Sequence, residues 1–486
     1  MVESRKSKVR FSLSVVGCPL SVELLHNEVI PRVKILLVNP SSADIFRQLN
    51  YCLPPMGLMS LATYLRQHGY DVALEDFQFQ PRGEQSFDFT PYAIVGIGSD
   101  TTRFPAALAI ARRAKQAGAF VVMGGPHPGS VADEALAAGD VDAVVCGEGE
   151  ATLLELVRAV EAHLPIEGLP GVATRRGADT VFGPPRPFIE PLDDLPFPAR
   201  DLLPLDRYHA TRIGDRPLAQ IITSRGCSHD CHFCSSSRFW GRKLRFRSIE
   251  SVVAELTEVY DRYGFRATAF VDDNFAARPN RVVAISEAII RNNWDLWWWC
   301  FARADHLVRH PEMVEAMARS GCKTVYVGVE SANEQSLRDY GKRSSVETVE
   351  QAFALLKRHG IQIFASYILG GLAEDRASTE ATIELARRLD SNIAQFSILT
   401  PYPGTRLFEQ LQDRLRHRDW RRYDMLHLVF RHPRFSAFRL YGYLLKANIR
   451  FYMRSREARR GFWRVMRRQG VGLRKIGQFF RSHLCG

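Results

Sequence analysis

The sequence predicts an α/β protein with a doubly wound parallel sheet, a partial (β/α)6 barrel and a small helical C-terminal region. Apolar runs typical of buried strands alternate with amphipathic helical stretches from Val33 to Asp413. A stretch rich in proline and glycine, residues 166–217, divides this alternation into two blocks. At 486 residues the chain can bury the cores of two or three such units.

The first block, residues 33–165, has the pattern of an open parallel sheet. The continuous apolar run VKILLVNP predicts a buried strand, and PMGLMSLATYLRQHGY predicts an amphipathic helix that ends at Gly69. Further strands are expected at DVALEDF, AIVGIGS, FVVMGGPHP and DAVVCGEGE, with the helix FPAALAIARRAKQAG between two of them. A Rossmann-like sheet of this kind binds ligands beyond the carboxyl ends of its strands.

Glycines collect at three of these strand ends. They are, with one adjacent serine, Gly98, Ser99, Gly124, Gly125, Gly147 and Gly149. Glycine lets the backbone approach a large ligand closely, so the repetition favours a flat or phosphate-bearing cofactor over ordinary turns. No G-x-G-x-x-G opens a helix after the first strand, which disfavours a dinucleotide.

Two segments lie outside the repeating pattern. Residues 1–32 are expected to be an N-terminal extension, because their apolar run is short and broken by serines, unlike an export signal. Residues 166–217, which include GPPRPFIEPLDDLPFPARDLLP, are expected to be an extended linker over the surface.

The second block, residues 218–413, repeats a strand and a helix six times. The expected strands are AQIITS, ATAFVDD, LWWWCFARAD, TVYVGVES, IQIFASYILGG and IAQFSILTPYP. Six β/α units predict a closed or partial barrel, in which the carboxyl ends of the strands carry the chemistry.

Three cysteines follow the first strand of this block. Cys227, Cys231 and Cys234 have the spacing C-x3-C-x2-C, and Gly226 before them permits a tight turn. A structural zinc site uses four ligands, usually as two pairs, and no second C-x2-C pair occurs in the sequence. A four-iron cluster held by three thiolates leaves one iron open to another ligand.

This spacing, with Phe233 before the last cysteine and at the first strand end of a six-unit barrel, resembles the radical S-adenosylmethionine superfamily. The resemblance implies a 4Fe-4S cluster whose open iron binds S-adenosyl-L-methionine and cleaves it to a 5′-deoxyadenosyl radical. It implies further contacts to S-adenosylmethionine from later strand ends, and it assigns no catalytic side chain. The residues at those ends are Asp272, Asp273, Arg303, Glu330, Ser331, Gly370, Gly371 and Glu374.

The first block, placed before such a barrel, resembles the cobalamin-binding domain of cobalamin-dependent radical S-adenosylmethionine enzymes. The resemblance implies that the six strand-end residues from Gly98 to Gly149 hold cobalamin. The sequence has no D-x-H-x-x-G, the motif that supplies a histidine to cobalt in many cobalamin proteins. His127 lies between two prolines and is expected to be a turn residue rather than a cobalt ligand.

The two resemblances imply a methyltransferase that acts on an unactivated carbon of a natural-product or lipid-like small molecule, through the 5′-deoxyadenosyl radical and methylcobalamin. An external electron donor similar to flavodoxin or ferredoxin goes with this chemistry. The alternative is an oxidative cyclase of the anaerobic Mg-protoporphyrin monomethyl ester type. A third hypothesis, which the motifs favour least, is a basic-tailed RNA- or membrane-binding module with a structural cluster.

The charge and the cysteine content indicate which partners and which cellular compartment to expect. The formal net charge is +12, and the basic residues are densest in residues 414–486, which also have a mainly helical pattern with aromatics. Such a region can contact an anionic membrane or be a solvated helical face, and sequence-specific nucleic-acid binding is not expected. Nine cysteines, three of them clustered, indicate a reducing cytoplasm rather than a disulfide framework.

Overall fold

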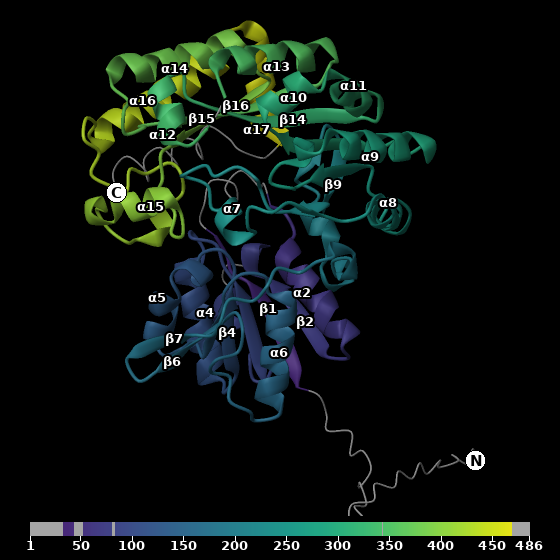
Figure 1. The fold of residues 1–486 in the computed structure, drawn as a ribbon, viewed down its shortest axis with the longest axis vertical. Helices are drawn as coiled ribbons and strands as arrows, with labels where there is room; N and C mark the ends of the chain where they lie inside the picture. Colours follow the sequence, from purple (N-terminus) through teal and green to yellow (C-terminus); the bar gives the residue numbers. More distant parts are fainter. Residues whose placement is uncertain (1–32, 43–51, 80–82, 343, 469–486) are drawn as a thin grey trace, which may run out of the picture. The chain divides into compact units, whose positions relative to one another are not determined.

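A computed structural model describes residues 33–42, 52–79, 83–342 and 344–468 (Figure 1). The predicted N-terminal extension and residues 469–486 lie outside the described residues. The described chain forms two seven-stranded sheets and one two-stranded ribbon, with helices on the sheets and at the C-terminal side. The predicted α/β fold class is confirmed.

The first sheet has the strand order β2-β1-β3-β4-β5-β6-β7. Its first five strands are parallel, and the direction of winding changes at β1, which has β2 on one side and β3 on the other. A crevice at such a switch point is the usual ligand site of an open sheet. The strands are β1 (Lys34–Asn39), β2 (Asp71–Asp76), β3 (Ile94–Gly98), β4 (Phe120–Gly124), β5 (Ala143–Val145), β6 (Val172–Arg176) and β7 (Asp179–Phe182).

Both faces of the first sheet are covered, which explains the unbroken apolar run of its first strand. Ile35 and Leu37 pack into a core with α2 and α6, whereas Leu36 and Val38 pack into a core with α4 and α5. The helices of this part are α2 (Met56–Gln67), α3 (Gly83–Ser86), α4 (Phe104–Gln116), α5 (Ala132–Ala137) and α6 (Glu150–Glu161).

The prediction of an extended linker at 166–217 was wrong for residues 172–182. There β6 and β7 form a hairpin that adds to the first sheet, antiparallel to β5. Gly177 lies at the turn of this hairpin, and the strands on either side of it carry β-branched residues. The neighbouring prolines obscured this signal in the sequence. The rest of the stretch contains the short turns η3 (Leu192–Asp194), η4 (Arg200–Leu202) and η5 (Leu205–Tyr208). The prediction was also wrong at the end of the stretch, where β8 (Arg212–Ile213) and the start of β9 (Arg216–Ile221) belong to the second sheet.

The second sheet has the order β16-β15-β14-β13-β12-β9-β8, with six parallel strands and the antiparallel β8 at one edge. No pairing between the two edge strands closes the sheet in the described part of the chain, so it is a partial barrel. The strands are β8 (Arg212–Ile213), β9 (Arg216–Ile221), β12 (Ala267–Phe270), β13 (Trp297–Ala302), β14 (Cys322–Glu330), β15 (Gln362–Leu369) and β16 (Ile393–Ile398).

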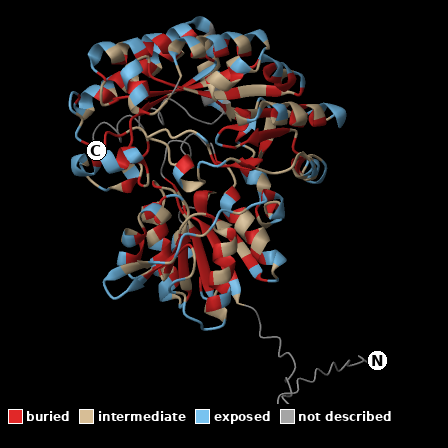
Figure 2. Ribbon diagram, viewed as in Figure 1, coloured by how far each residue is buried: buried red, intermediate tan, exposed pale blue. Residues whose placement is uncertain are grey.

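Helices cover the outer face of this sheet, and Figure 2 shows buried strands beneath helices whose outward faces are exposed. On β13 the outward side chains Trp298 and Cys300 are fully buried, while the inward Trp299 and Phe301 are only partly buried. The helices are α7 (Ser236–Phe239), α8 (Ile249–Thr257), α9 (Pro279–Arg291), α10 (Ala304–Arg309), α11 (Pro311–Arg319), α12 (Glu334–Asp339), α13 (Val346–Arg358), α14 (Arg376–Leu389) and α15 (Arg406–Leu411).

Two further helices, α16 (Ala437–Tyr452) and α17 (Arg456–Arg468), make the described part of the predicted helical C-terminal region. Helix α16 packs against α14 and β16, and it buries Leu440, Ala447 and Phe451. None of the described helices has the length and hydropathy needed to span a bilayer.

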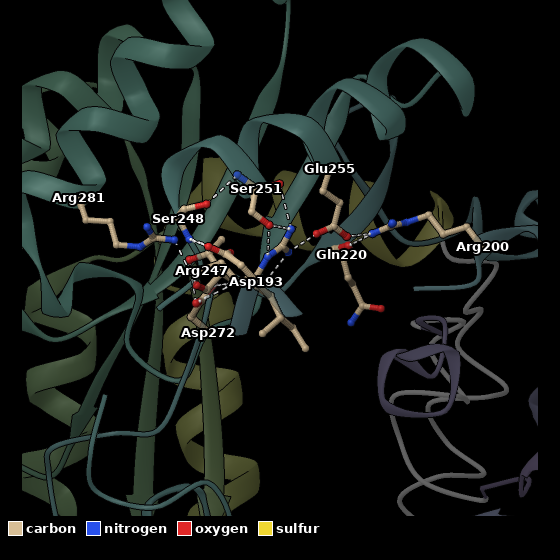
Figure 3. A network of polar contacts seen from close by, with 11 residues as sticks. Asp193, Arg200, Gln220, Arg247, Ser248, Ser251, Glu255, Asp272 and Arg281 are labelled. Atoms are coloured by element: carbon tan, nitrogen blue, oxygen red, sulfur yellow. Dashed lines mark hydrogen bonds and ion pairs between the residues drawn. The ribbon is translucent and has the colours of Figure 1, made fainter. Parts of the chain in front are cut away.

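A buried polar network attaches the segment around η4 to the second sheet (Figure 3). Glu255 on α8 is fully buried and lies between two arginines, Arg200 of η4 at 2.6 Å and Arg247. Nearby, the Asp193 carboxylate accepts a hydrogen bond from the Ser248 backbone N–H at 2.9 Å. The attachment therefore depends on one carboxylate that neutralises two buried guanidinium groups.

We expect Glu255→Gln to lower the free energy of unfolding by about 3–5 kcal/mol, because it leaves buried positive charge without its counterion. Asp201→Asn is the matched control, since Asp201 pairs with Arg66 where both side chains are more than 40% exposed. That change should cost about 1 kcal/mol or less. Urea denaturation followed by circular dichroism measures both values, and equal small losses would contradict the role of Glu255.

Candidate cofactor-binding site

The cysteine loop is closed at its base by the two-stranded ribbon, in which β10 (Ser224–Arg225) pairs with β11 (Arg245–Phe246). Gly226 then turns the chain at a φ of +96°, and a β-carbon there would collide with the carbonyl oxygen of Lys243. Only glycine meets both conditions. The three cysteines that follow, called the cluster cysteines below, are all partly buried.

The far side of the loop is held by backbone hydrogen bonds to later elements. The His232 N–H donates to the carbonyl of Tyr340 at the end of α12, at 2.9 Å, and the Leu407 N–H of α15 donates to the His232 carbonyl at 2.9 Å. Phe233, which the sequence singled out, packs edge-on against the Tyr340 ring at 5.4 Å. The loop is therefore fixed at its base and at its centre.

Burial raises the pKa of all three cluster cysteines, that of Cys231 to about 11. Without a metal centre the thiols therefore stay protonated at neutral pH, and a cluster bound by them would have to displace their protons. No three His, Cys, Asp or Glu side chains among the described residues are gathered as ligands of a single metal ion. A four-iron cluster does not require such a group, because each thiolate binds a different iron.

Three predicted side chains from the strand ends lie near the cluster cysteines. The positive charge of Arg303 lowers the pKa of two of the three thiols. The negative charges of Asp273 and Glu330 each raise the pKa of two of them. Burial raises the pKa of Asp273 itself to about 6. Arg303 donates a hydrogen bond to Asp305 at 3.0 Å, which orients its guanidinium at the end of β13. Charges of both signs thus surround the thiols.

Glu330 has the most unusual backbone among these residues. It follows an irregularity in the pairing of β14 with β15, and its φ is +68°, a conformation that costs a non-glycine residue about 1–2 kcal/mol. Lys342 donates to its carboxylate at 2.6 Å, and Ser366 donates at 3.2 Å. Lys342 was missed in the sequence, because it lies outside the strand-end motifs on which the prediction rested.

Asp272 is fully buried at the end of β12, and its carboxylate is used within the chain. It accepts hydrogen bonds from the backbone N–H of Thr223 at 3.1 Å, from the Thr223 hydroxyl at 2.9 Å and from the Ser224 hydroxyl. These residues lead directly into the cysteine loop. Asp272 therefore anchors that segment, and its predicted contact with S-adenosylmethionine stays a prediction.

Glu374 has a similar structural use at the ends of β14 and β15. Its carboxylate accepts from the Ser331 hydroxyl at 2.7 Å and from the backbone N–H groups of Gly370 at 2.9 Å and Gly371 at 3.2 Å. Four of the predicted residues are thus brought together in one arrangement that joins two strand ends. Whether any of the four contacts a cofactor stays a prediction.

The glycines at the strand ends of the first sheet are of two kinds: some allow close packing within the protein, and one leaves its backbone open. Gly125 has a φ of +108°, and a β-carbon there would lie 2.6 Å from the Ser99 carbonyl oxygen, so two strand ends approach closely. Around Gly147 no atom lies within 4 Å of the place where a β-carbon would stand, which leaves its backbone open to a ligand. At Gly98 and Gly149, by contrast, the missing β-carbon makes room for leucine side chains of α2.

Comparison with known proteins agrees with this arrangement. The B12 binding domain family matches residues 43–157, and the radical SAM superfamily matches residues 221–386. An uncharacterized methyltransferase of Pyrococcus horikoshii is 36% identical over 87% of this chain and 93% of its own length. The chain belongs to the cobalamin-dependent radical S-adenosylmethionine enzymes.

One further relative and one solved structure are similar to this chain. The bacteriochlorophyllide d C-12(1)-methyltransferase of Chlorobaculum tepidum is 29% identical over 90% of this chain and 91% of its own length. The structure of the radical S-adenosylmethionine methyltransferase TsrM from Kitasatospora setae, with cobalamin and a [4Fe-4S] cluster bound, shares the fold. Its TM-score is 0.67 at 20% identity, and the likeness covers 79% of this chain and 75% of that one.

The radical S-adenosylmethionine enzyme is of the methyltransferase type, and its cofactors are a 4Fe-4S cluster, S-adenosylmethionine and cobalamin. Asn274, next to Asp273, fits such a ligand set. Its side chain is 3% exposed, and neither amide atom has a hydrogen-bond partner among the described residues. A buried amide without partners costs about 1–3 kcal/mol, and the amino acid part of S-adenosylmethionine offers both a donor and acceptors.

His127 lies at a turn, as the sequence suggested, but its ring is buried rather than exposed. The ring nitrogen Nδ1 lies 3.1 Å from the Thr101 hydroxyl, and Phe104 and Trp420 pack against the ring at 4.5 and 4.8 Å. Burial lowers the pKa of His127 to about 4, so the imidazole is neutral at neutral pH. The expectation that it does not bind cobalt stays a prediction.

We expect Gly226→Ala to lower the iron content of the reconstituted enzyme several-fold although all three cysteines are present, because the turn into the loop cannot form. Gly264→Ala is the matched control. Gly264 also has a positive φ, +71°, but nothing lies within 4 Å of a β-carbon there. Iron and sulfide analysis after anaerobic reconstitution should separate the two variants, and equal iron content would refute the role of Gly226.

Proposed function

We propose that this enzyme methylates an unactivated carbon of an apolar, flat small molecule of the natural-product or lipid-like class. The observation that carries the proposal is a ladder of aromatic side chains on the inner face of the partial barrel. The ladder, formed by Trp299, Phe301, Tyr326 and Phe364, lies below the strand ends that hold the charged residues.

Successive rings of the aromatic ladder touch across three neighbouring strands. Their centroids are 5.0 Å apart between Trp299 and Phe301, 5.0 Å between Phe301 and Tyr326, and 4.7 Å between Tyr326 and Phe364. All four side chains are only partly buried, although their strands lie in the middle of the sheet. The rings meet edge-on or tilted, at interplanar angles of 69°, 57° and 44°, and their accessible faces and edges offer van der Waals contact to a flat apolar substrate.

Toward the carboxyl ends of the same strands, the residues on the inner face are polar instead of aromatic. Tyr326 lies 3.5 Å from the Gln395 side chain, and Ser366 and Glu330 follow farther along the strands. This gradient would place the apolar part of a substrate on the ladder and direct its reacting carbon toward the cysteine loop. When bound, the cluster with S-adenosylmethionine supplies hydrogen-atom abstraction and cobalamin supplies the methyl group. The side chains of the chain orient the substrate and exclude water.

The proposal is tested with the anaerobically reconstituted enzyme, a flavodoxin or ferredoxin reductant and a panel of flat polycyclic compounds. We expect a product heavier by one CH2, together with S-adenosylhomocysteine and 5′-deoxyadenosine, all measured by mass spectrometry. An oxidised product without an added methyl group would instead support the cyclase alternative and contradict methyl transfer.

A substitution in the ladder sharpens the same experiment. Phe301→Ala removes about 2 kcal/mol of apolar contact, so the KM of a compound that is turned over should rise about tenfold or more with a smaller change in kcat. Phe182→Ala is the control, because this phenylalanine of β7 is 56% exposed. An unchanged KM in the Phe301 variant would place the substrate elsewhere.

We further propose that α16 docks on an anionic membrane. Phe438 is 84% exposed, Ile449 is 53% exposed and Met453 is 38% exposed. With Gly442 and Leu445 between them, these residues recur at intervals of three and four, so they form one apolar stripe. Residues 414–486 contain 20 lysines and arginines against three acidic residues, which is the charge that an anionic surface attracts.

We expect the double change Phe438→Asp and Ile449→Asp to reduce binding to phosphatidylserine-containing vesicles at least tenfold, since two apolar side chains no longer insert. Leu164→Asp, at a position that is 60% exposed in the first block, serves as control. Co-sedimentation with anionic and with neutral vesicles measures the effect. Binding that the double change leaves intact, or a stripe that mediates self-association in sedimentation velocity, would contradict membrane docking.

A further inference from the structure

Four charged side chains form a buried cluster beside the cysteine loop, called the arginine–glutamate cluster below. Arg225 contacts Glu148 at 2.8 Å and Glu150 at 2.5 Å, and Arg245 contacts both oxygens of Glu148 at 2.9 Å. The four side chains are 8%, 3%, 5% and 1% exposed, in the order Arg225, Glu148, Glu150 and Arg245. Two positive and two negative charges thus compensate one another out of contact with water.

The arginine–glutamate cluster joins the cysteine loop to the glycine loop after β5, the two loops that are predicted to bind cofactors. Arg225 and Arg245 face each other in the ribbon that closes the cysteine loop, and Arg225 is only two residues before Cys227. On the other side, Glu148 lies between Gly147 and Gly149 in the loop that joins β5 to α6. Glu148 and Glu150 are therefore chain neighbours of glycines predicted to bind cobalamin, and Arg225 lies two residues before a cluster cysteine.

Further contacts leave the cluster little freedom to rearrange. The Ile189 N–H donates to Glu148 at 2.7 Å, and Arg245 donates to the Ile189 carbonyl at 2.8 Å and to the Trp240 carbonyl at 3.1 Å. The Trp240 ring also stacks on the Arg225 guanidinium, at 4.8 Å. Buried ion pairs add little net stability compared with apolar packing, but they can specify one geometry.

We propose that the arginine–glutamate cluster couples cobalamin binding at the first sheet to the cysteine loop, with these four side chains acting as positioning residues. A ligand that orders the backbone at Gly147 and Gly149 also orders Glu148, and Glu148 holds both strands of the ribbon at the base of the loop. Whichever cofactor binds first therefore removes part of the ordering cost for the second. The inference rests on the two cofactors and not on methyl transfer or on any substrate.

If the two sites are coupled, each cofactor should raise the affinity of the protein for the other. Hydroxocobalamin should bind the cluster-loaded protein about tenfold more tightly than the cluster-free protein, within the usual range of coupling between sites. Both dissociation constants follow from the visible spectrum under anaerobic titration without substrate. The paramagnetic resonance spectrum of the reduced iron–sulfur cluster should also change when hydroxocobalamin is added.

In Glu148→Gln the affinity ratio should fall to about one, and the spectrum of the reduced iron–sulfur cluster should no longer respond to hydroxocobalamin. Glu255→Gln is the matched control, because Glu255 is also a buried carboxylate between two arginines but belongs to neither cofactor loop. It should lose stability and keep the ratio. This comparison separates coupling from general destabilisation.

Arg245→Lys is a second, milder variant for the case that Glu148→Gln does not fold. It keeps the charge, but its single nitrogen cannot bond Glu148 and the Trp240 carbonyl at once as the two terminal guanidinium nitrogens of Arg245 do, so it should give an intermediate ratio. The proposal would be overturned if hydroxocobalamin bound the unmodified protein equally well with and without the iron–sulfur cluster. It would also be overturned if a folded variant of the arginine–glutamate cluster kept the affinity ratio of the unmodified protein. Because no turnover is measured, a failure of methyl transfer leaves this test unaffected.

Discussion

The segment from Thr223 to Gly226 is bound from two sides before the chain reaches its first cluster cysteine. Asp272 accepts hydrogen bonds from the start of this segment, and Arg225 pairs with two carboxylates at the start of α6, Glu148 and Glu150. Gly226 then fixes the direction of the turn. If the loop binds the cluster, as its cysteines predict, it needs such external support, because metal ligands must be held within narrow limits.

The buried polar groups around the site are of two kinds: those that have hydrogen-bond partners within the protein and those that have none among the described residues. Asp272 and Glu374 each receive several hydrogen bonds from nearby strand ends, so they maintain the scaffold. Asn274 is just as deeply buried but has no partner among the described residues. Since buried polar groups in folded proteins are nearly always paired, we expect this amide, like other buried atoms without a partner, to be open to a ligand or a water molecule. Burial alone would not have distinguished these roles.

The sequence was sufficient for the order of strands and helices along the chain, because parallel strands buried on both faces are continuous apolar runs. It also allowed the cysteine loop to be proposed as the cluster site, because its three cysteines lie within eight residues, and their role as ligands stays a prediction. It could not predict which charges pair, since Arg225 and Glu148 are 77 residues apart and meet only through the packing of two sheets. The hairpin at 172–182 was missed for a local reason, namely the prolines on both sides of a weak strand signal.

Arginine has two different uses in this protein, and the difference bears on membrane docking. Buried arginines such as Arg225, Arg245 and Arg200 are neutralised by glutamates and add nothing to the external field. Residues 1–413 contain 45 lysines and arginines against 50 acidic residues, so the excess positive charge lies in residues 414–486. A chain with its charges separated in this way is attracted to an anionic surface by one end and repelled by the other. Electrostatics would therefore orient the enzyme with α16 toward the membrane before any apolar side chain inserts, and this orientation would weaken as salt shortens the range of the field.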